Sequence, residues 1–223
     1  MDEQLEFLQS IPYFRGLGSD ELESVKGIVF EKLAERGDLI LVEGQAADVM
    51  YFVGSGVVKL FKTSADGKEQ ILALVRPGES INDVSVFDGG PNIASAQAMG
   101  PVVLYGIGKD DLDGVMREHP QVALNANSAL AGQVRRLAAL VEDLSFRHVT
   151  ERVAKILLEY AGNGTSPQPR LTQQEMAAMA GTVREVVGRA LKALEDEGMI
   201  RIDRHRIAIT DRRALEDMVE TYY

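Results

Sequence analysis

Cysteine is absent from the 223-residue chain, and histidine occurs only three times. The lack of cysteine excludes disulfides, thiolate nucleophiles, cysteine-ligated zinc and iron–sulfur clusters. No apolar run approaches the roughly 20 residues that a membrane-spanning helix needs. The acidic start of the chain, MDEQLE, lacks the features of a signal peptide. We therefore expect a cytoplasmic protein with no membrane partner, built as one large or two modest domains.

The acidic charge is confined to one part of the sequence. The net charge is −10, but the residues from 145 onward hold 12 Lys and Arg against 12 Asp and Glu, so the first 144 residues carry the whole excess. The acidic part would repel nucleic acid, whereas the neutral part can still present a basic face. An uneven charge that serves solubility alone is the alternative interpretation.

Residues 171–191 have the pattern of two helices joined by a tight turn at Gly181. In the second helix, at about 3.6 residues per turn, one side carries the polar residues Arg184, Glu185, Arg189 and Lys192. The opposite side is an apolar stripe that can seat the helix on a core, formed by Val183, Val187, Ala190, Leu191 and Leu194. A helix that is held by one face and presents arginines on the other suits the major groove of DNA.

Local signals bound these two helices. We expect Thr172 to cap the first helix, with Glu175 completing a capping box, and Gly198 to end the second. Residues 162–169 are a loop by composition. Two short β-type runs at 200–202 and 206–209 flank Asp203-Arg204-His205 and predict a short basic hairpin, or wing.

The segment from about residue 33 to residue 108 has a different texture, with short β-type runs separated by glycine. The runs are 39–42, 50–53, 57–61 and 71–75, and Asp66-Gly67 is a hairpin turn signal between the last two. Strands at such short, regular spacing predict a small β-barrel or sandwich. Residues 1–30 are expected to be helical, with a helix start at Ser19. No catalytic spacing occurs among the predicted strands.

A long helix is predicted after Pro120, because only Gly132 interrupts the chain before Gly162. One heptad position is occupied by Ala123, Leu130, Leu137 and Leu144, and another by Asn127, Val134 and Val141. Leucine at d, valine at a and a single asparagine at a are typical of a parallel two-stranded coiled coil. The pattern favours a two-fold dimer. A helix packed on its own barrel is the alternative.

Taken in order, these parts resemble the CRP/FNR family of bacterial transcription regulators, from Ile11-Pro12-Tyr13-Phe14 to Ile209-Thr210-Asp211. The matching motifs in the β-rich part are Glu43-Gly44, Tyr51, Gly56, Asp66-Gly67 and Pro77-Gly78-Glu79, and those after it are Leu171-Thr172-Gln173-Gln174-Glu175 and 184–189. The resemblance implies an α+β fold. A cyclic-nucleotide-binding-type, jelly-roll-like β-roll with N-terminal helices would sense an effector over 1–118. A long dimerisation helix would span 119–147, and a winged helix-turn-helix would bind DNA over 148–223.

The resemblance also implies how DNA is recognised. Arg184, Glu185 and Arg189 match the recognition-helix trio of the cAMP receptor branch, which implies a palindrome with TGTGA-like half-sites. Arginine can donate two bonds to guanine, and glutamate can accept one from cytosine. A solvated ion pair between Glu185 and Arg189 is the alternative. The DNA-binding set is completed by Thr172, Gln174, Thr182 and Lys192, of which Thr172 and Gln174 would hold phosphates. RNA polymerase is a further expected partner. Nothing in the chain supports an enzyme or a metal site.

The segment that binds the nucleotide in cAMP-binding relatives departs from the family pattern here. Asn82 and Asp83 replace a glycine–glutamate pair, and Asn92-Ile93 replaces an arginine–serine pair. A phosphate placed there would meet no cation, and burying an unpaired anion costs several kcal/mol. The threonine–serine pair that closes over the nucleotide aligns with Leu137-Ala138, which is apolar. We therefore expect an effector other than cAMP in a pocket formed by these six residues.

Residues 91–98 are similar to the matching segment of the nitrate-respiration and hybrid-cluster-protein regulators, which are associated with haem, nitric oxide and nitrosative stress. Haem is accordingly one candidate effector. Ligation does not follow easily, because His119, His148 and His205 are expected at the surface or at helix ends, and Met50, Met99 or Tyr51 could ligate only by exception. A cAMP-responsive regulator with a divergent pocket and an effector-binding module acting on a protein partner are the alternatives.

Overall fold

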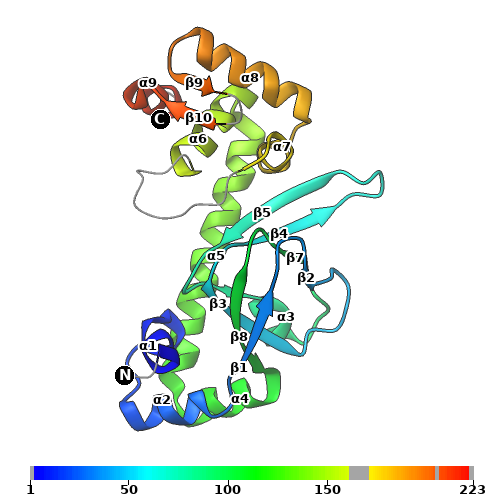
Figure 1. Cartoon of the computed structure of the whole chain (residues 1–223). Helices are drawn as coiled ribbons and strands as arrows, with labels where there is room; N and C mark the ends of the chain where they lie inside the picture. Colours follow the sequence, from blue (N-terminus) through cyan, green and yellow to red (C-terminus); the bar gives the residue numbers. More distant parts are fainter. Residues whose placement is uncertain (1–2, 161–170, 204–205, 221–223) are drawn as a thin grey trace. The chain divides into compact units, whose positions relative to one another are not determined.

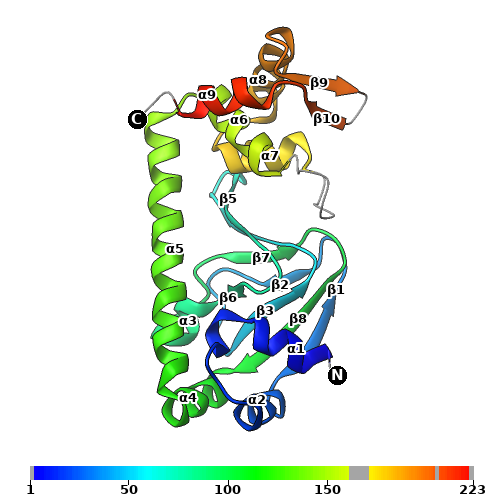
Figure 2. The ribbon, with the colours of Figure 1, turned by 90° about the vertical axis from the view of Figure 1, so that its left-hand side faces the viewer.

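The computed structural model describes residues 3–160, 171–203 and 206–220. The chain forms two compact units, residues 1–62 with 72–137 and residues 63–71 with 138–223. One helix, α5 (Pro120–Phe146), contributes residues to both units and is uninterrupted in Figures 1 and 2. Among the described residues, no helix is long and apolar enough to cross a membrane.

Eight of the described strands form two antiparallel sheets, which confirms the predicted β-roll. The first sheet has the order β1-β8-β3-β6, formed by Phe30–Ala34, Val102–Gly108, Val49–Ser55 and Ser80–Ile81. The second has the order β2-β7-β4-β5, formed by Leu39–Leu41, Ser95–Ala98, Val58–Thr63 and Glu69–Val75. Strand β1 begins at Phe30, earlier than the sequence predicted, because Phe30 pairs with Gly106 and its ring covers that glycine.

Strand β3 is the centre of the first unit because both of its faces are buried. Met50 and Phe52 point into a core shared with the helices, whereas Tyr51 and Val53 point between the two sheets. This alternation follows from the period of two in a strand. The continuous apolar run of β3 is typical of a strand that is covered on both sides.

Helices enclose the other face of the first sheet. They are α1 (Glu3–Ser10), η1 (Pro12–Phe14), α2 (Ser19–Lys26), α4 (Lys109–Glu118) and the start of α5, while α3 (Asp83–Asp88) follows β6. Figure 2 shows α2 and α4 beside the first turns of α5. The first turns of α5 enter this core through Val122 and Ala126, which are 0% and 4% exposed. Helix α2 is capped by Gly18, whose N–H donates to Glu21 at 2.6 Å.

The second unit contains the predicted helix-turn-helix and wing. Its elements are α6 (Val149–Tyr160), α7 (Gln173–Ala180), α8 (Arg184–Asp196), β9 (Ile200–Asp203), β10 (Arg206–Ile209) and α9 (Arg212–Glu220). Their shared core includes Ala154, Ala177, Val187, Leu194 and Leu215, none of which has any exposed surface. The predicted loop at 162–169 and the wing residues Arg204 and His205 lie outside the described residues.

We predict that Gly56→Ala destabilises the β-roll. Gly56 has a φ of +81°, and a Cβ there would lie 2.3 Å from the carbonyl oxygen of Pro101. Gly67 is a matched control, because it has the same φ of +81° with no atom within 4 Å of its Cβ position. In chemical denaturation followed by circular dichroism, Gly67→Ala should lose about 1 kcal/mol and Gly56→Ala about 3 kcal/mol or more. Equal losses would contradict the role assigned to Pro101.

Candidate nucleic-acid interface and effector site

A complete capping box starts helix α7, as predicted. The hydroxyl of Thr172 accepts the N–H of Glu175 at 3.1 Å, and the carboxylate of Glu175 accepts the N–H of Thr172 at 2.6 Å. Two N–H groups at this helix start therefore have partners. Thr172 and Gln174 are exposed at the same end of the helix. Their amide and hydroxyl groups are accessible to an anion such as a DNA phosphate.

The turn after α7 depends on Gly181. This residue adopts the left-handed conformation, with φ 64° and ψ 36°, and its N–H donates to the carbonyl of Ala177. A Cβ at this position would lie 2.6 Å from Cδ2 of Leu144, a residue of α5. Glycine is required here both by the backbone conformation and by the close packing of Leu144.

Helix α8 has the two opposite faces that the sequence predicted. Val187, Ala190, Leu191 and Leu194 are buried in the core of the second unit. The other face exposes Arg184, Glu185, Arg189 and Lys192, while Thr182 before the helix is half-buried. Among the described residues, no ion pair joins Glu185 to Arg189, so both side chains are available for other partners. Val183 is 50% exposed and serves as the N-cap, so it lies outside the buried stripe to which the sequence assigned it.

The wing is a two-stranded hairpin attached to the end of α8. Arg206 is paired with Asp203, and Ala208 with Arg201, and these four residues form the exposed face. The N–H of Ile202 donates to Glu195 of α8 at 2.7 Å. This bond joins β9 to α8.

The predicted dimer stripe on α5 is exposed over the second half of the helix. Val134, Leu137, Val141 and Leu144 are 65%, 44%, 64% and 36% exposed. Asn127 is exposed, and Leu130 is half-buried. Contiguous apolar residues at heptad spacing on an exposed helix are typical of an interface with a second helix.

The predicted effector pocket begins with Asn82 and Asp83, at the start of α3. Asn82 has a φ of 77° and is the one non-glycine residue with a positive φ in the described part of the chain. Its side-chain amide donates to the carbonyl of Val49 at 3.0 Å. A left-handed asparagine costs less than most residues there, and its amide is already used to hold β3.

Asp83 is a buried carboxylate, with only 2% of its surface exposed. Its Oδ2 accepts from the hydroxyl of Tyr13 at 2.7 Å, from the hydroxyl of Ser80 at 2.8 Å and from the side-chain amide of Gln133 on α5. Its Oδ1 has no partner among the described residues. Burial raises the pKa of Asp83 although the three donors lower it. The pKa of Tyr13 is also raised, by burial and by the adjacent carboxylate.

The residues that replace the arginine–serine pair have separate environments. Asn92 is 4% exposed and donates its side-chain amide to the carbonyl of Val42, while its backbone bonds Gly44 and Gln45. Ile93 is 50% exposed. Asn92 therefore holds a loop, and only its Oδ1 is left without a partner in the described structure.

One contact of this segment was not foreseen from the sequence. The ammonium of Lys62 donates to the Ile93 carbonyl at 3.0 Å and pairs with Glu43 at 2.6 Å. Lys62 follows the predicted strand 57–61 in the sequence, and only the register of β4 against β7 brings it to Ile93. Motif matching could not find this contact, because it depends on how two strands pair in the folded protein.

Helix α5 contributes Gln133 to the surroundings of the predicted pocket, and nothing in the sequence indicated this residue. Gln133 is the α5 residue bonded to Asp83. Leu137 and Ala138 follow it along the helix, and both are exposed. Arg136, which precedes Leu137, approaches Glu79 at 3.8 Å.

The described residues do not fit a haem site. Met50, Met99 and Tyr51 are buried in the cores of the β-roll, with 0%, 6% and 7% of their surface exposed. His119 pairs with Glu21 at 3.0 Å, and His148 lies exposed beside the start of α6. His205 lies outside the described residues. In the described ranges, no group of three or more His, Cys, Asp or Glu side chains could hold a metal ion.

Comparison with known proteins connects both units to one family. Residues 31–119 match the cyclic nucleotide-binding domain, and residues 151–218 match the Crp-like helix-turn-helix domain. The Cyclic AMP receptor protein of Thermus thermophilus is 33% identical over 95% of this chain and 98% of its own length. The CRP-like cAMP-activated global transcriptional regulator of Mycobacterium tuberculosis is 32% identical, over 81% of this chain and 84% of its own length. The structure of FixK2 from Bradyrhizobium japonicum, 25% identical, matches with a TM-score of 0.75 over 86% of this chain and 97% of that one.

A cyclic-nucleotide-binding-type β-roll, a long helix and a helix-turn-helix define a DNA-binding transcription regulator, and such regulators are not enzymes. The chain belongs to the CRP/FNR family of these regulators. The fold class and the non-enzymatic role inferred from the sequence are thereby confirmed.

We predict that Asp83 makes the stability of the β-roll depend on pH. Because the pKa of Asp83 is raised on folding, its proton is held more tightly in the folded state. The contribution of this proton to the free energy of unfolding is fully present below about pH 4, the pKa of an aspartate in the unfolded chain. It is lost as the pH rises through the pKa of Asp83 in the folded state. Wild type should therefore lose stability relative to Asp83→Asn as the pH rises. Urea titrations from pH 4 to pH 8 measure the difference between the free energies of unfolding of the two proteins.

The control for this measurement is Asp88→Asn, which removes an exposed carboxylate from the last position of the same helix. This variant should follow the wild-type pH dependence. A difference between Asp83→Asn and wild type that stays constant from pH 4 to pH 8 would contradict the prediction.

Proposed function

We propose that this regulator binds, as a homodimer, a palindrome with TGTGA-type half-sites. The supporting observation is that α8 exposes Arg184, Glu185 and Arg189 on one face, while its opposite face is buried in the core of the second unit. Arginine forks match guanine O6 and N7, and glutamate matches the amino group of cytosine. An exposed carboxylate between arginines is unfavourable near phosphates, so its presence favours base contact over a general affinity for DNA.

The apolar stripe of α5 supports the dimer. Val134 and Val141, each about two-thirds exposed, occupy the a positions of the heptad pattern. A parallel pair of such helices has two-fold symmetry, and a palindromic operator has the same symmetry. Residues 119–147 serve as the dimerisation helix in this proposal, with sensing assigned to 1–118, DNA binding to 148–223, and RNA polymerase as a further partner.

The effector is proposed to act by shifting a population. It binds the β-roll at the segment of Asn82, Asp83, Asn92 and Ile93 and at Leu137-Ala138 of α5, and it favours the conformation that is competent to bind DNA. We propose that this effector is not cAMP. The arginine that would neutralise a cyclic phosphate is missing, and Asn92, which replaces it, uses its amide to hold the carbonyl of Val42.

A cAMP-responsive regulator is the second candidate, and one observation favours it. Lys62 places an ammonium group at the Ile93 carbonyl, and a cation in this position could partly replace the missing arginine. Its pairing with Glu43 opposes that role, because a phosphate would have to compete with a carboxylate already in contact. Two of the similar proteins are named as a cyclic AMP receptor and as a cAMP-activated regulator, so the response to cAMP has to be measured.

A fluorescence-anisotropy titration of a TGTGA-type palindrome decides between the two effector classes. Affinity should not change more than about threefold when saturating cAMP is added to the wild-type protein. The control variant is Lys62→Gln, which removes the cation without touching α8. An increase of about a hundredfold with cAMP, lost in Lys62→Gln, would overturn our proposal and establish the second candidate.

Base recognition is tested separately by Glu185→Ala. We predict that this variant relaxes discrimination at one base pair in each half-site, by about 1–3 kcal/mol, while binding to other positions is retained. Asp196→Ala, an exposed acid at the end of the same helix, is the matched control and should leave specificity unchanged. Competition gel shifts with singly substituted operators measure both. If wild type itself shows no sequence preference, a module acting on a protein partner becomes the better description.

A further inference from the structure

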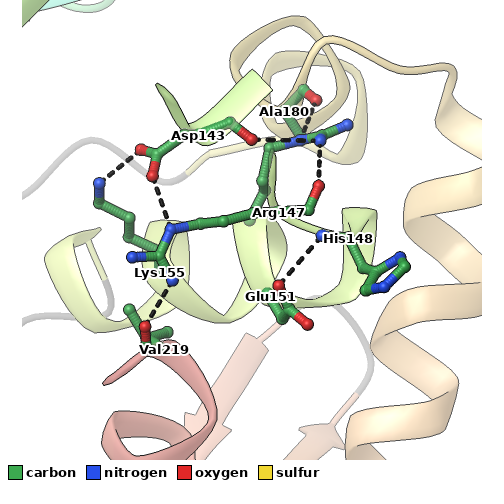
Figure 3. Close-up of polar contacts among 8 residues, drawn as sticks. Asp143, Arg147, His148, Glu151, Lys155, Ala180 and Val219 are labelled. Atoms are coloured by element: carbon green, nitrogen blue, oxygen red, sulfur yellow. Dashed lines mark hydrogen bonds and ion pairs between the residues drawn. The ribbon is translucent and has the colours of Figure 1, made fainter. Parts of the chain in front are cut away.

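A part-buried acid, Asp143, lies in the last turn of α5. Asp143 accepts from the side-chain Nε of Arg147 at 2.7 Å and, through its other oxygen, from the ammonium of Lys155 on α6. The side chains of Asp143 and Arg147 are 16% and 8% exposed. Charge-assisted hydrogen bonds are about twice as strong as neutral ones, and low exposure reduces their screening. Figure 3 shows this cluster.

Two arginines extend the cluster to the other helices of the second unit. Arg147 donates to the carbonyl of Val219 in the last turn of α9. Arg152, on α6, donates through Nε to the carbonyl of Ala180, the last residue of α7, at 2.8 Å. The end of α5 is thus connected by side-chain bonds to α6, α7 and α9. We call Asp143, Arg147, Arg152 and Lys155 the hinge network.

The connection between α5 and α6 has no free backbone group. It consists of Arg147 and His148 alone, since α5 ends at Phe146 and α6 begins at Val149. The N–H of Arg147 donates to Asp143, and its carbonyl accepts from Arg152 at 2.6 Å. The N–H of His148 donates to Glu151 at 3.0 Å, and its carbonyl accepts the N–H of Arg152. With all four groups bonded, this two-residue connection cannot rotate without breaking hydrogen bonds.

Apolar packing reinforces the same attachment. Leu144 lies so close to the helix-turn-helix turn that a Cβ at Gly181 would be 2.6 Å from its Cδ2. Leu144 also belongs to the apolar stripe of α5 that we assign to the dimer. The dimerisation surface and the turn before α8 therefore share one side chain.

We propose that the hinge network makes the last turn of α5 a rigid part of the DNA-binding unit, and that it thereby sets the half-site spacing that the dimer accepts. This inference rests on the proposed function. In a two-fold dimer the distance between the two recognition helices follows from the angle at which each leaves the dimer axis. A stiff attachment allows one angle, and hence one spacer length. A loose attachment allows several.

The experiment measures the affinity of the full-length protein for palindromes whose half-sites are separated by the optimal spacer or by one base pair more or fewer. Wild type should lose at least tenfold in affinity at either changed spacer. In Asp143→Asn this penalty should fall to threefold or less, while affinity for DNA with a single half-site stays within twofold of wild type. Arg152→Lys, which cannot bond two carbonyls in the fork geometry of arginine, should behave in the same way and serves if Asp143→Asn does not fold.

The matched control is Glu216→Gln, which breaks the exposed ion pair between Arg212 and Glu216 within α9, 2.7 Å long. This variant should keep the wild-type spacing penalty. The inference alone is overturned if wild type shows a sharp optimum that both hinge variants retain, or if the variants lose single half-site binding as well. A wild-type protein that binds no palindrome at any spacing would overturn the proposed function and this inference with it.

Discussion

The structure depends on α5 remaining one continuous helix while its surroundings change along its length. Its first turns are buried in the core of the β-roll through Val122 and Ala126, and Gln133 bonds the buried carboxylate of Asp83. Its second half exposes an apolar stripe, and its last turn is held by Arg147 and Lys155. The carboxylate of Asp83 in the first unit and the side chains of Arg147 and Lys155 in the second are therefore bonded to residues in different turns of the same helix.

The buried polar groups of the proposed effector site are bonded to other parts of the protein. Asp83 and Asn92 are buried. Oδ2 of Asp83 accepts from Tyr13, Ser80 and Gln133, and the side-chain amide of Asn92 donates to the carbonyl of Val42. What remains without a partner among the described residues is acceptor oxygen, Oδ1 of each residue, together with the hydroxyl of Ser85. Of these three groups, only the hydroxyl of Ser85 is a donor that could bond an anionic ligand, whereas the two Oδ1 oxygens are acceptors. The exposed Lys62 donates to the Ile93 carbonyl, and the carboxylate of Glu43 is already paired with it.

The second unit uses the same residue types for two purposes, which burial separates. Asp143 and Arg147 are almost buried and bonded on several sides, so their charges hold helices together. Glu185 and Arg189 are exposed on α8, and within the described residues no ion pair joins them, so their charges face outward. Removing a buried partner leaves an uncompensated charge, whereas removing an exposed one costs the fold little. In this unit, the charged residues that join the helices are therefore different from those exposed on α8.

The helix-turn-helix was predictable from sequence because its signals are local: Thr172 and Glu175 are three residues apart, Gly181 alone permits the left-handed turn, and the stripe of α8 repeats at helical spacing. The exposure of Val134 and Val141 agrees with the heptad periodicity in the same way, whereas the α+β fold class was implied by the resemblance to the CRP/FNR family. The environments of Asp83 and Lys62 could not be predicted from the sequence. Asp83 is bonded to groups 70 and 50 residues away, and Lys62 reaches a carbonyl 31 residues away. Such pairs are decided by strand register and by the packing of helices on sheets, which no local pattern encodes. The sequence by itself determined that a capped helix-turn-helix carries a charged face on its second helix, because helix caps and helical spacing are local. Only the tertiary structure decided which polar groups of Asp83 and Asn92 are already bonded within the protein, because their partners lie far away in the sequence.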